Sequence, residues 1–193
     1  ETEPKGFWLD RSARVFGLFF DEKLNPKRAL YSHALKAAAA GQTGEAAALY
    51  ERALSAEEPP PDNGRTMYWQ DIQWSRRLLN ARIELSRCRL LLDEDKDEEA
   101  AAALDRARRG VGGDDDAVNL LQARLDVRRG DYEKAFRRLR KGITDEGDLE
   151  SGEGYALLAV AAKATGHKEE LEKASKKARD SGVEMTVLAQ PGS

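Results

Sequence analysis

Hydrophobic positions recur every three or four residues along most of the 193-residue chain, with charged residues between them. This spacing gathers apolar side chains on one face of an α-helix. Alternating runs of Val, Ile, Thr and aromatic residues, which would predict strands, do not occur in the sequence. The pattern therefore predicts helices over residues 7–22, 27–40, 43–56, 65–92, 97–109, 115–129, 132–142, 152–165 and 168–181.

Proline and glycine residues separate the predicted helices. Most prolines occur where a helix would begin or end, and glycines fall between most of the helical stretches. Because the connections are short, consecutive helices are expected to lie antiparallel as hairpins. One hairpin cannot bury both of its apolar faces, so further hairpins must stack on it. The pattern predicts an all-α fold of repeated helix hairpins.

The first predicted hairpin contains a distinctive spacing of small and aromatic residues. Gly41 at the turn is followed by Ala46, Tyr50 and Ala53, and the two alanines would let the helices approach closely. This spacing resembles the tetratricopeptide repeat (TPR) position for position. The resemblance implies a right-handed α-α superhelix, a TPR-like solenoid of about four helix hairpins with an extra N-terminal helix. It also implies that the first helix of each hairpin lines a concave face where ligands bind.

Three later copies of this spacing are less regular. The third and fourth copies retain the turn glycine, at Gly130 and Gly166, whereas the second has Asp95 there. The first two copies lie further apart than the family period of about 34 residues, so an insertion precedes the second copy. The resemblance covers about residues 28–181. Its other matching positions are Ala100, Leu104, Ala107, Ala135, Leu139, Tyr155, Leu158, Ala159 and Ala178.

The sequence predicts a single helical-repeat domain over residues 1–193, because no clear linker divides the chain. The last predicted helix offers only a few small or apolar residues to the interior, as the end of a finite array requires; these are Leu171, Ala174 and Ala178. The predicted segments are an aromatic capping helix (7–22), repeat 1 (27–58), an insertion with a helix extension (59–77), repeat 2 (78–110), repeat 3 (115–145), repeat 4 (152–181) and a tail (183–193).

The helix predicted over 65–92 is longer than its neighbours, at about 40 Å, and would overhang them. It carries two apolar stripes, which predicts packing on both sides. The aromatic residues of this extension and of the N-terminal helix are interpreted as a cap on the first repeat. A self-association or partner-binding patch is the alternative. The residues concerned are Phe7, Trp8, Phe16, Phe19, Phe20, Trp69 and Trp74.

The composition is typical of a soluble folded protein, with 40% hydrophobic and 35% charged residues. A net charge of -3 gives no global positive field, so neither nucleic acid nor an anionic membrane is an expected partner. No apolar run approaches the roughly 20 residues of a membrane-spanning helix. Because the chain begins at Glu1, we expect that an upstream segment was removed, which leaves cytoplasmic and periplasmic or cell-envelope locations open.

Few residues are candidates for chemistry. Cys88 is the only cysteine, so it cannot form an intrachain disulfide and is interpreted as a small apolar helix residue. His33 is predicted to be partly buried and His167 to be exposed, and neither has a second metal ligand at helical spacing. No metal, cofactor or catalytic group is expected from these residues.

Two acidic runs and one glycine-rich stretch have structural interpretations. Residues 93–99 lack the glycine and the final glutamate of a calcium loop, so they are predicted to form a charged turn that leads into a helix. Asp114–Asp116 are predicted to cap the next helix. Gly110–Gly113 lack the Lys-Ser/Thr ending of a phosphate loop and are predicted to form a turn. The chain is therefore predicted not to be an enzyme.

The first helices of the repeats supply the candidate binding residues. Counted from each turn, the groove positions are Arg28, Tyr31, Arg82, Arg89, Arg124, Arg128 and Lys163. A mildly basic groove predicts a partner protein with an acidic peptide segment or C-terminus, bound by charge-assisted hydrogen bonds. The alternative is that these cations only solvate the helix face. The Lys-Asn pattern with which some TPR proteins clamp chaperone carboxylates does not occur at these positions, which disfavours that role.

Two functional hypotheses follow. The first is a non-catalytic scaffold that binds a segment of a partner protein in the concave groove. The second is a structural or assembly protein that forms homo-oligomers through its aromatic N-terminal helix and the extension bearing Trp69 and Trp74.

Overall fold

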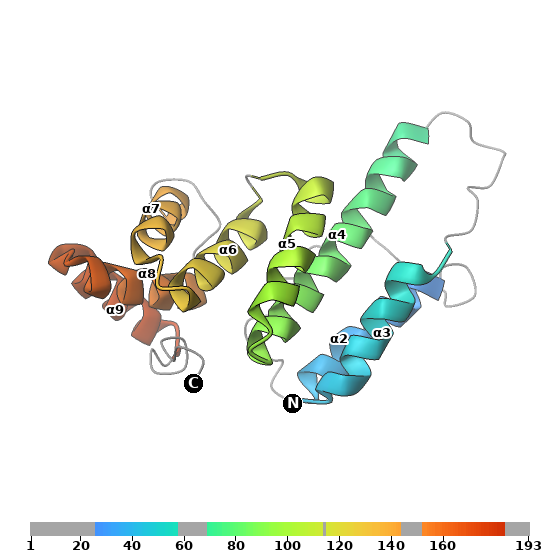
Figure 1. Cartoon of the computed structure of the whole chain (residues 1–193), viewed down its shortest axis with the longest axis horizontal. Helices are drawn as coiled ribbons and strands as arrows, with labels where there is room; N and C mark the ends of the chain where they lie inside the picture. The colour runs from blue at the N-terminus through green and yellow to red at the C-terminus, as the bar shows by residue number, and fades with distance from the viewer. Residues whose placement is uncertain (1–25, 58–68, 114, 144–151, 184–193) are drawn as a thin grey trace. The chain divides into compact units, whose positions relative to one another are not determined.

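The computed structural model describes residues 26–57, 69–113, 115–143 and 152–183, with side chains in the long fourth helix from Arg76 onward. These ranges contain eight α-helices and no strand (Figure 1). The all-α class is therefore confirmed. The helices are α2 (Pro26–Ala39), α3 (Thr43–Ser55), α4 (Trp69–Asp93), α5 (Asp97–Val111), α6 (Asp116–Arg128), α7 (Tyr132–Ile143), α8 (Gly152–Thr165) and α9 (Lys168–Asp180).

Most of the predicted helix boundaries lie within two residues of the observed ones. The predicted start of α4, at residue 65, lies outside the described residues, which resume at Trp69. One difference concerns Gly110, which was predicted to lie in a turn but belongs to the last turn of α5. The turn begins at Gly112, whose φ of 96° ends the helix. The helix predicted over 7–22, with its five aromatic residues, lies outside the described residues.

The chain divides into two compact units, Glu1–Arg65 and Thr66–Ser193, whereas the sequence favoured one continuous domain. Helices α2 and α3 pack as a hairpin in the first unit. Tyr50 is buried in this hairpin, and its ring lies 6.2 Å from that of Tyr31. The small residues at the repeat positions, Ala46 and Ala53, are completely buried, as close packing of two helices requires.

The second unit contains three hairpins, α4–α5, α6–α7 and α8–α9. Helix α6 also packs against both α4 and α8, so the first helices of the three hairpins are neighbours. Two apolar clusters meet on α6: Leu121 and Leu125 pack with α4 and α5, whereas Leu120 and Ala123 pack with α7, α8 and α9. Helix α6 therefore belongs to both cores.

The helix extension of α4 is visible in Figure 1, where α4 reaches past the end of α5. A Cβ on Gly110, near the end of α5, would lie 2.7 Å from the Ala81 Cβ and 2.9 Å from the Arg77 carbonyl oxygen. The end of α5 thus touches α4 near these residues, and the first two turns of α4 continue beyond it. Trp69 and Trp74 lie on this extension, but their side chains are outside the described part.

Each hairpin of the described chain turns in the same way. One or two residues after the first helix, the chain has a positive φ: 74° at Gly41, 59° at Asp95, 77° at Gly130 and 80° at Gly166. The next residue donates its N–H to a carbonyl five positions earlier, as in Lys96 N to Leu91 O at 2.9 Å. This is the Schellman motif, for which glycine is preferred because L side chains strain at positive φ. Asp95 adopts the glycine conformation in the one copy that lacks the glycine.

Candidate functional site

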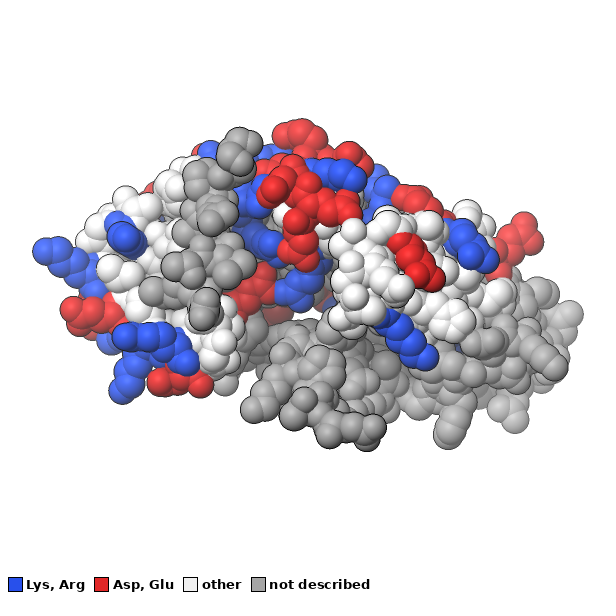
Figure 2. All heavy atoms as spheres, turned by 90° about the horizontal axis from the view of Figure 1, so that it is seen from below, with Lys and Arg blue, Asp and Glu red and all other residues white. Residues whose placement is uncertain are grey.

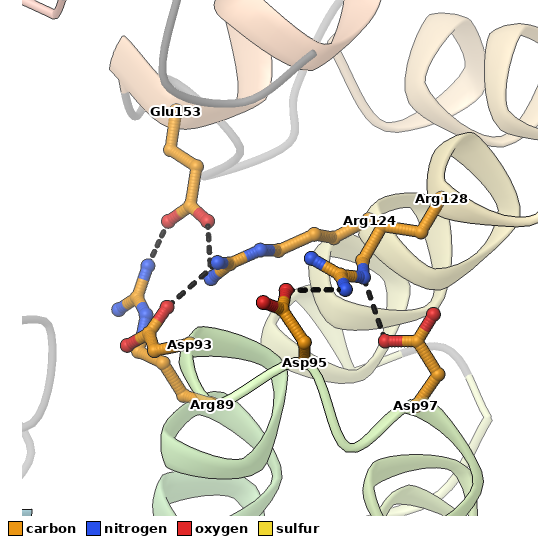
Figure 3. A network of polar contacts seen from close by, with 7 residues as sticks. All are labelled: Arg89, Asp93, Asp95, Asp97, Arg124, Arg128 and Glu153. Atoms are coloured by element: carbon orange, nitrogen blue, oxygen red, sulfur yellow. Dashed lines mark hydrogen bonds and ion pairs between the residues drawn. The ribbon is translucent and has the colours of Figure 1, made fainter. Parts of the chain in front are cut away.

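The neighbouring first helices of the second unit carry two adjacent groups of ion pairs, one around Arg124 and one around Arg128. Arginines from α4 and α6 meet carboxylates from the end of α4, the α4–α5 turn and the start of α5 and α8 (Figure 3). We call this set the first-helix network. Its members are Arg89, Asp93, Asp95, Asp97, Arg124, Arg128 and Glu153.

Arg128 ties α6 to the α4–α5 turn. Its Nη2 donates to Asp95 Oδ1 at 2.6 Å, and its Nε donates to Asp97 Oδ1 at 2.6 Å. Burial opposes the charge of Arg128, but the hydrogen bonds to the two aspartates outweigh burial and raise the pKa of the guanidinium. Charged hydrogen bonds of this kind are stronger than neutral ones, so Arg128 fixes the contact between the first two hairpins of the unit.

Arg124 and Arg89 converge on one carboxylate. Arg124 donates from Nη2 to Asp93 Oδ1 at 2.6 Å, and its Nη1 lies 3.6 Å from Glu153 Oε1. Arg89 donates from Nη2 to Glu153 Oε2. Burial and the positive charge of Arg124 lower the pKa of Arg89. Glu153 therefore compensates two guanidinium groups that would otherwise repel each other.

The two arginines of α6 are more buried than the acids at the end of α4 and in the α4–α5 turn. The side chains of Arg124 and Arg128 are 14% and 11% exposed, whereas those of Asp93 and Asp95 are 53% and 69% exposed. The three arginines and four carboxylates of the first-helix network leave one net negative charge. Figure 2 shows basic and acidic side chains interleaved instead of a field of one sign. This balance differs from the mildly basic surface that the sequence predicts.

The remaining predicted groove residues lie in different settings. Arg82 forms an ion pair with Asp115, with Nη2 and Oδ2 3.6 Å apart. Tyr31 is 8% exposed, which makes it a core residue of the α2–α3 hairpin. Arg28 is half-buried in that same hairpin, and Lys163 is exposed on α8. The structure thus brings together Arg89, Arg124 and Arg128, while Tyr31 and Arg28 belong to the other unit.

The strained position of Asp95 gives a testable consequence. Asparagine tolerates positive φ as well as aspartate does, so Asp95→Asn removes the charge without changing the turn. Because Asp95 is largely exposed, we expect a loss of about 0.5–1 kcal/mol in unfolding free energy at low salt. Chemical denaturation at low salt and in 1 M NaCl checks this, since salt screens an exposed pair. An equal loss at both salt concentrations would contradict the ion-pair explanation.

Two further buried acids are held by arginines on other faces of the helices. Glu84 is 6% exposed and accepts from Arg106 Nε at 2.5 Å and Nη2 at 3.2 Å. Asp126 is 5% exposed and accepts from Gln122 Nε2 at 3.0 Å and from Arg138 Nε at 3.5 Å. These pairs connect α4 with α5 and α6 with α7, so we assign them a structural role.

The two histidines differ from their predicted settings. His33 is exposed, because the buried face of α2 contains positions 31, 34 and 37 and His33 is not on that face. His167 is half-buried, with its ring stacked on that of Phe136 at 4.1 Å between centroids and 11° between planes. Both expectations were therefore wrong. Within the ranges that the structure describes, no group of three or more His, Cys, Asp or Glu side chains could hold a metal ion.

The cysteine and the acidic runs match their structural interpretations. Cys88 is completely buried in α4, and burial raises the pKa of its thiol to about 12. Residues 93–99 form the α4–α5 turn and the acidic first turn of α5. Asp115 caps α6, since its Oδ1 accepts from Ala117 N at 3.0 Å and Val118 N at 3.2 Å. Asp114 lies outside the described residues.

The carboxylates of the first-helix network were missed in the count of groove positions. That count ran along the middle of each first helix, whereas the acids lie at helix ends and in a turn. A usable signal is the separation in sequence: Arg124 and Asp93 are 31 residues apart, as are Arg128 and Asp97. Residues about one repeat apart lie side by side in stacked hairpins, so opposite charges at that separation are candidate pairs.

Comparisons with known proteins add no family to this description. No protein-family model matches the sequence, and searches of curated proteins and of solved structures gave no match. Of the described helices, none has the length and apolar character that crossing a membrane requires.

Proposed function

We propose that this chain is a non-catalytic scaffold of the TPR type, which binds a segment of a partner protein across the first helices α4, α6 and α8. The observation that carries the proposal is the adjacency of these three helices, each belonging to a different hairpin. Stacked hairpins of this kind present a continuous surface that can follow an extended partner.

The resemblance to TPR proteins is part of this proposal. It is supported by the shared turn conformation at Gly41, Asp95, Gly130 and Gly166. Burial of the small repeat residues also supports it, because Ala46, Ala100 and Ala135 are each 0% exposed. A right-handed superhelix of such hairpins would place α4, α6 and α8 on its concave side.

The proposed partner segment is acidic or ends in a carboxylate. Three arginines of the first-helix network provide planar donors that match carboxylate oxygens. In the uncomplexed chain these donors hold the chain's own acids, so a partner must compete with them. Competition lowers affinity but makes binding selective for segments whose carboxylates fit the arginine positions.

Charge reversal at Lys163 tests the proposed binding face. Lys163 is exposed on α8 and Lys176 is exposed on α9, so both can be replaced by Glu with the same change in net charge. After capture from the source organism and identification by mass spectrometry, the partner is titrated against both variants. We expect Lys163→Glu to weaken binding about tenfold and Lys176→Glu to leave it unchanged. Equal affinity of the two variants would remove α8 from the binding face.

The second candidate function is assembly of several copies of this chain. The observation that favours it is the part of α4 that continues past α5 (Figure 1), because an overhanging helix offers a surface that its own hairpin does not cover. Light scattering coupled to size-exclusion chromatography measures the mass directly. A monomer at all concentrations would leave the scaffold as the better proposal, and an oligomer that Trp69→Ala and Trp74→Ala dissociate would favour assembly.

A further inference from the structure

Glu153 belongs to the third hairpin of the second unit, and its side chain reaches the first hairpin of that same unit. It lies in the first turn of α8, yet it pairs with Arg89 on α4 as well as with Arg124 on α6. Helices α4 and α8 each pack on α6, so this pair bridges the face on which a partner would lie. Figure 3 shows the Glu153 carboxylate pointing down between the two guanidinium groups.

The position of α8 does not depend on this ion pair. Tyr155, Ala156 and Leu157 are 5%, 0% and 0% exposed in the apolar clusters with α9 and α7. Gly152 adds a close contact, since a Cβ there would lie 2.5 Å from Val183 Cγ2. Apolar packing therefore holds the start of α8, and the Glu153 carboxylate can leave the arginines without unfolding the helix.

Arg89 and Arg124 need a compensating negative charge even when the Glu153 carboxylate has moved away from them. Arg89 has a pKa lowered by burial and by Arg124, which means that the pair is electrostatically unfavourable without a compensating charge. Asp93 supplies one negative charge, because its Oδ1 lies 2.6 Å from Arg124 Nη2. One further negative charge completes the balance, which fits a carboxylate; a phosphate dianion would be repelled by the adjacent aspartates.

We propose that Arg89 and Arg124 form a carboxylate-binding site, which Glu153 fills in the uncomplexed chain and which an acidic side chain or C-terminus of the partner fills in the complex. This inference rests on the proposed scaffold function and adds its regulation: Glu153 is an internal competitor. It sets the threshold of affinity that a partner segment must exceed. Weakly acidic segments are excluded because they cannot displace it.

The test removes the internal competitor and measures an acidic probe. Decaglutamate is titrated by calorimetry against the wild type, Glu153→Ala and Glu98→Ala. Glu98 is the matched control. It accepts a hydrogen bond at 3.1 Å from Arg129 of the following hairpin, and its loss changes the net charge by the same amount. We expect Glu153→Ala to bind decaglutamate about tenfold more tightly than the other two proteins. Adding Arg89→Gln or Arg124→Gln to Glu153→Ala should abolish the gain.

A second readout uses acetate at constant ionic strength. Glu153→Ala leaves space for a small carboxylate, so acetate in place of chloride should raise its melting temperature and leave that of Glu98→Ala unchanged. The inference is overturned if decaglutamate binds the three proteins equally, or if the tight binding survives loss of both arginines. If Glu153→Ala and the shape-conserving Glu153→Gln both fail to fold, the Glu153 ion pairs are required for the fold and the inference is also wrong. In either case, loss of partner binding on Lys163→Glu would still support the scaffold.

Discussion

Replacement of Leu125 by alanine is expected to lower the free energy of unfolding by about 3–4 kcal/mol. Leu125 is 0% exposed and packs in the cluster that joins α6 to α4 and α5. Truncation removes buried methyl groups and leaves a cavity that the surrounding helices can only partly fill. The cavity also lies in the helix that both apolar clusters share, so the loss should reach both neighbouring hairpins.

Urea denaturation followed by circular dichroism measures this effect. The matched control is Leu171→Ala, because Leu171 is only partly buried on α9. Its loss should cost about 1 kcal/mol, in proportion to the smaller apolar area removed from the interior. If the two leucine variants were equally stable, the central position of α6 in the packing would be incorrect.

Replacement of Gly110 by alanine is expected to cost about 2 kcal/mol, although alanine normally stabilises a helix by up to about 1 kcal/mol over glycine. The new Cβ would meet the Ala81 Cβ at 2.7 Å and the Arg77 carbonyl oxygen at 2.9 Å. Neither atom belongs to the end of a flexible side chain. Helices α4 and α5 would have to move apart, and such overpacking costs about 1–3 kcal/mol.

Gly113→Ala provides the control three residues later. A Cβ at Gly113 would meet no atom within 4 Å. Alanine there should be neutral or slightly stabilising, because it lowers the conformational entropy of the unfolded chain. Thermal denaturation of both variants distinguishes local crowding from a general intolerance of the α5–α6 connection. A stable Gly110→Ala protein would show that the two helices are further apart than their glycine contact indicates.

The helices were predictable from the sequence because their stability depends on local and periodic information. Apolar residues at helical spacing, with glycine or proline between them, located the ends of α3, α6 and α8 to within two residues. Small residues also marked the close contacts, since Ala46, Ala53 and Ala107 are fully buried. The exception is Gly110, whose sequence neighbours suggest a turn; its close packing on α4 keeps it in the helix.

The candidate site was predictable only in part, because it depends on side chains that are distant in sequence. The sequence indicated Arg89, Arg124 and Arg128, and the structure places all three in one network. Their acidic partners could not be assigned without the stacking of the hairpins, which brings Glu153 within reach of Arg89 across 64 residues. The stacking of His167 on Phe136 was missed for the same reason.

The separation of the paired charges has a consequence for how the hairpins are ordered. Arg124, Arg128 and Arg129 each find an acid 31 residues earlier, in the hairpin that precedes their own. A hairpin moved elsewhere in the array would set its arginines against a neighbour without those acids. These charges are specific to one neighbour. The order of these two hairpins, α4–α5 before α6–α7, is therefore encoded in their charges as well as in their apolar contacts.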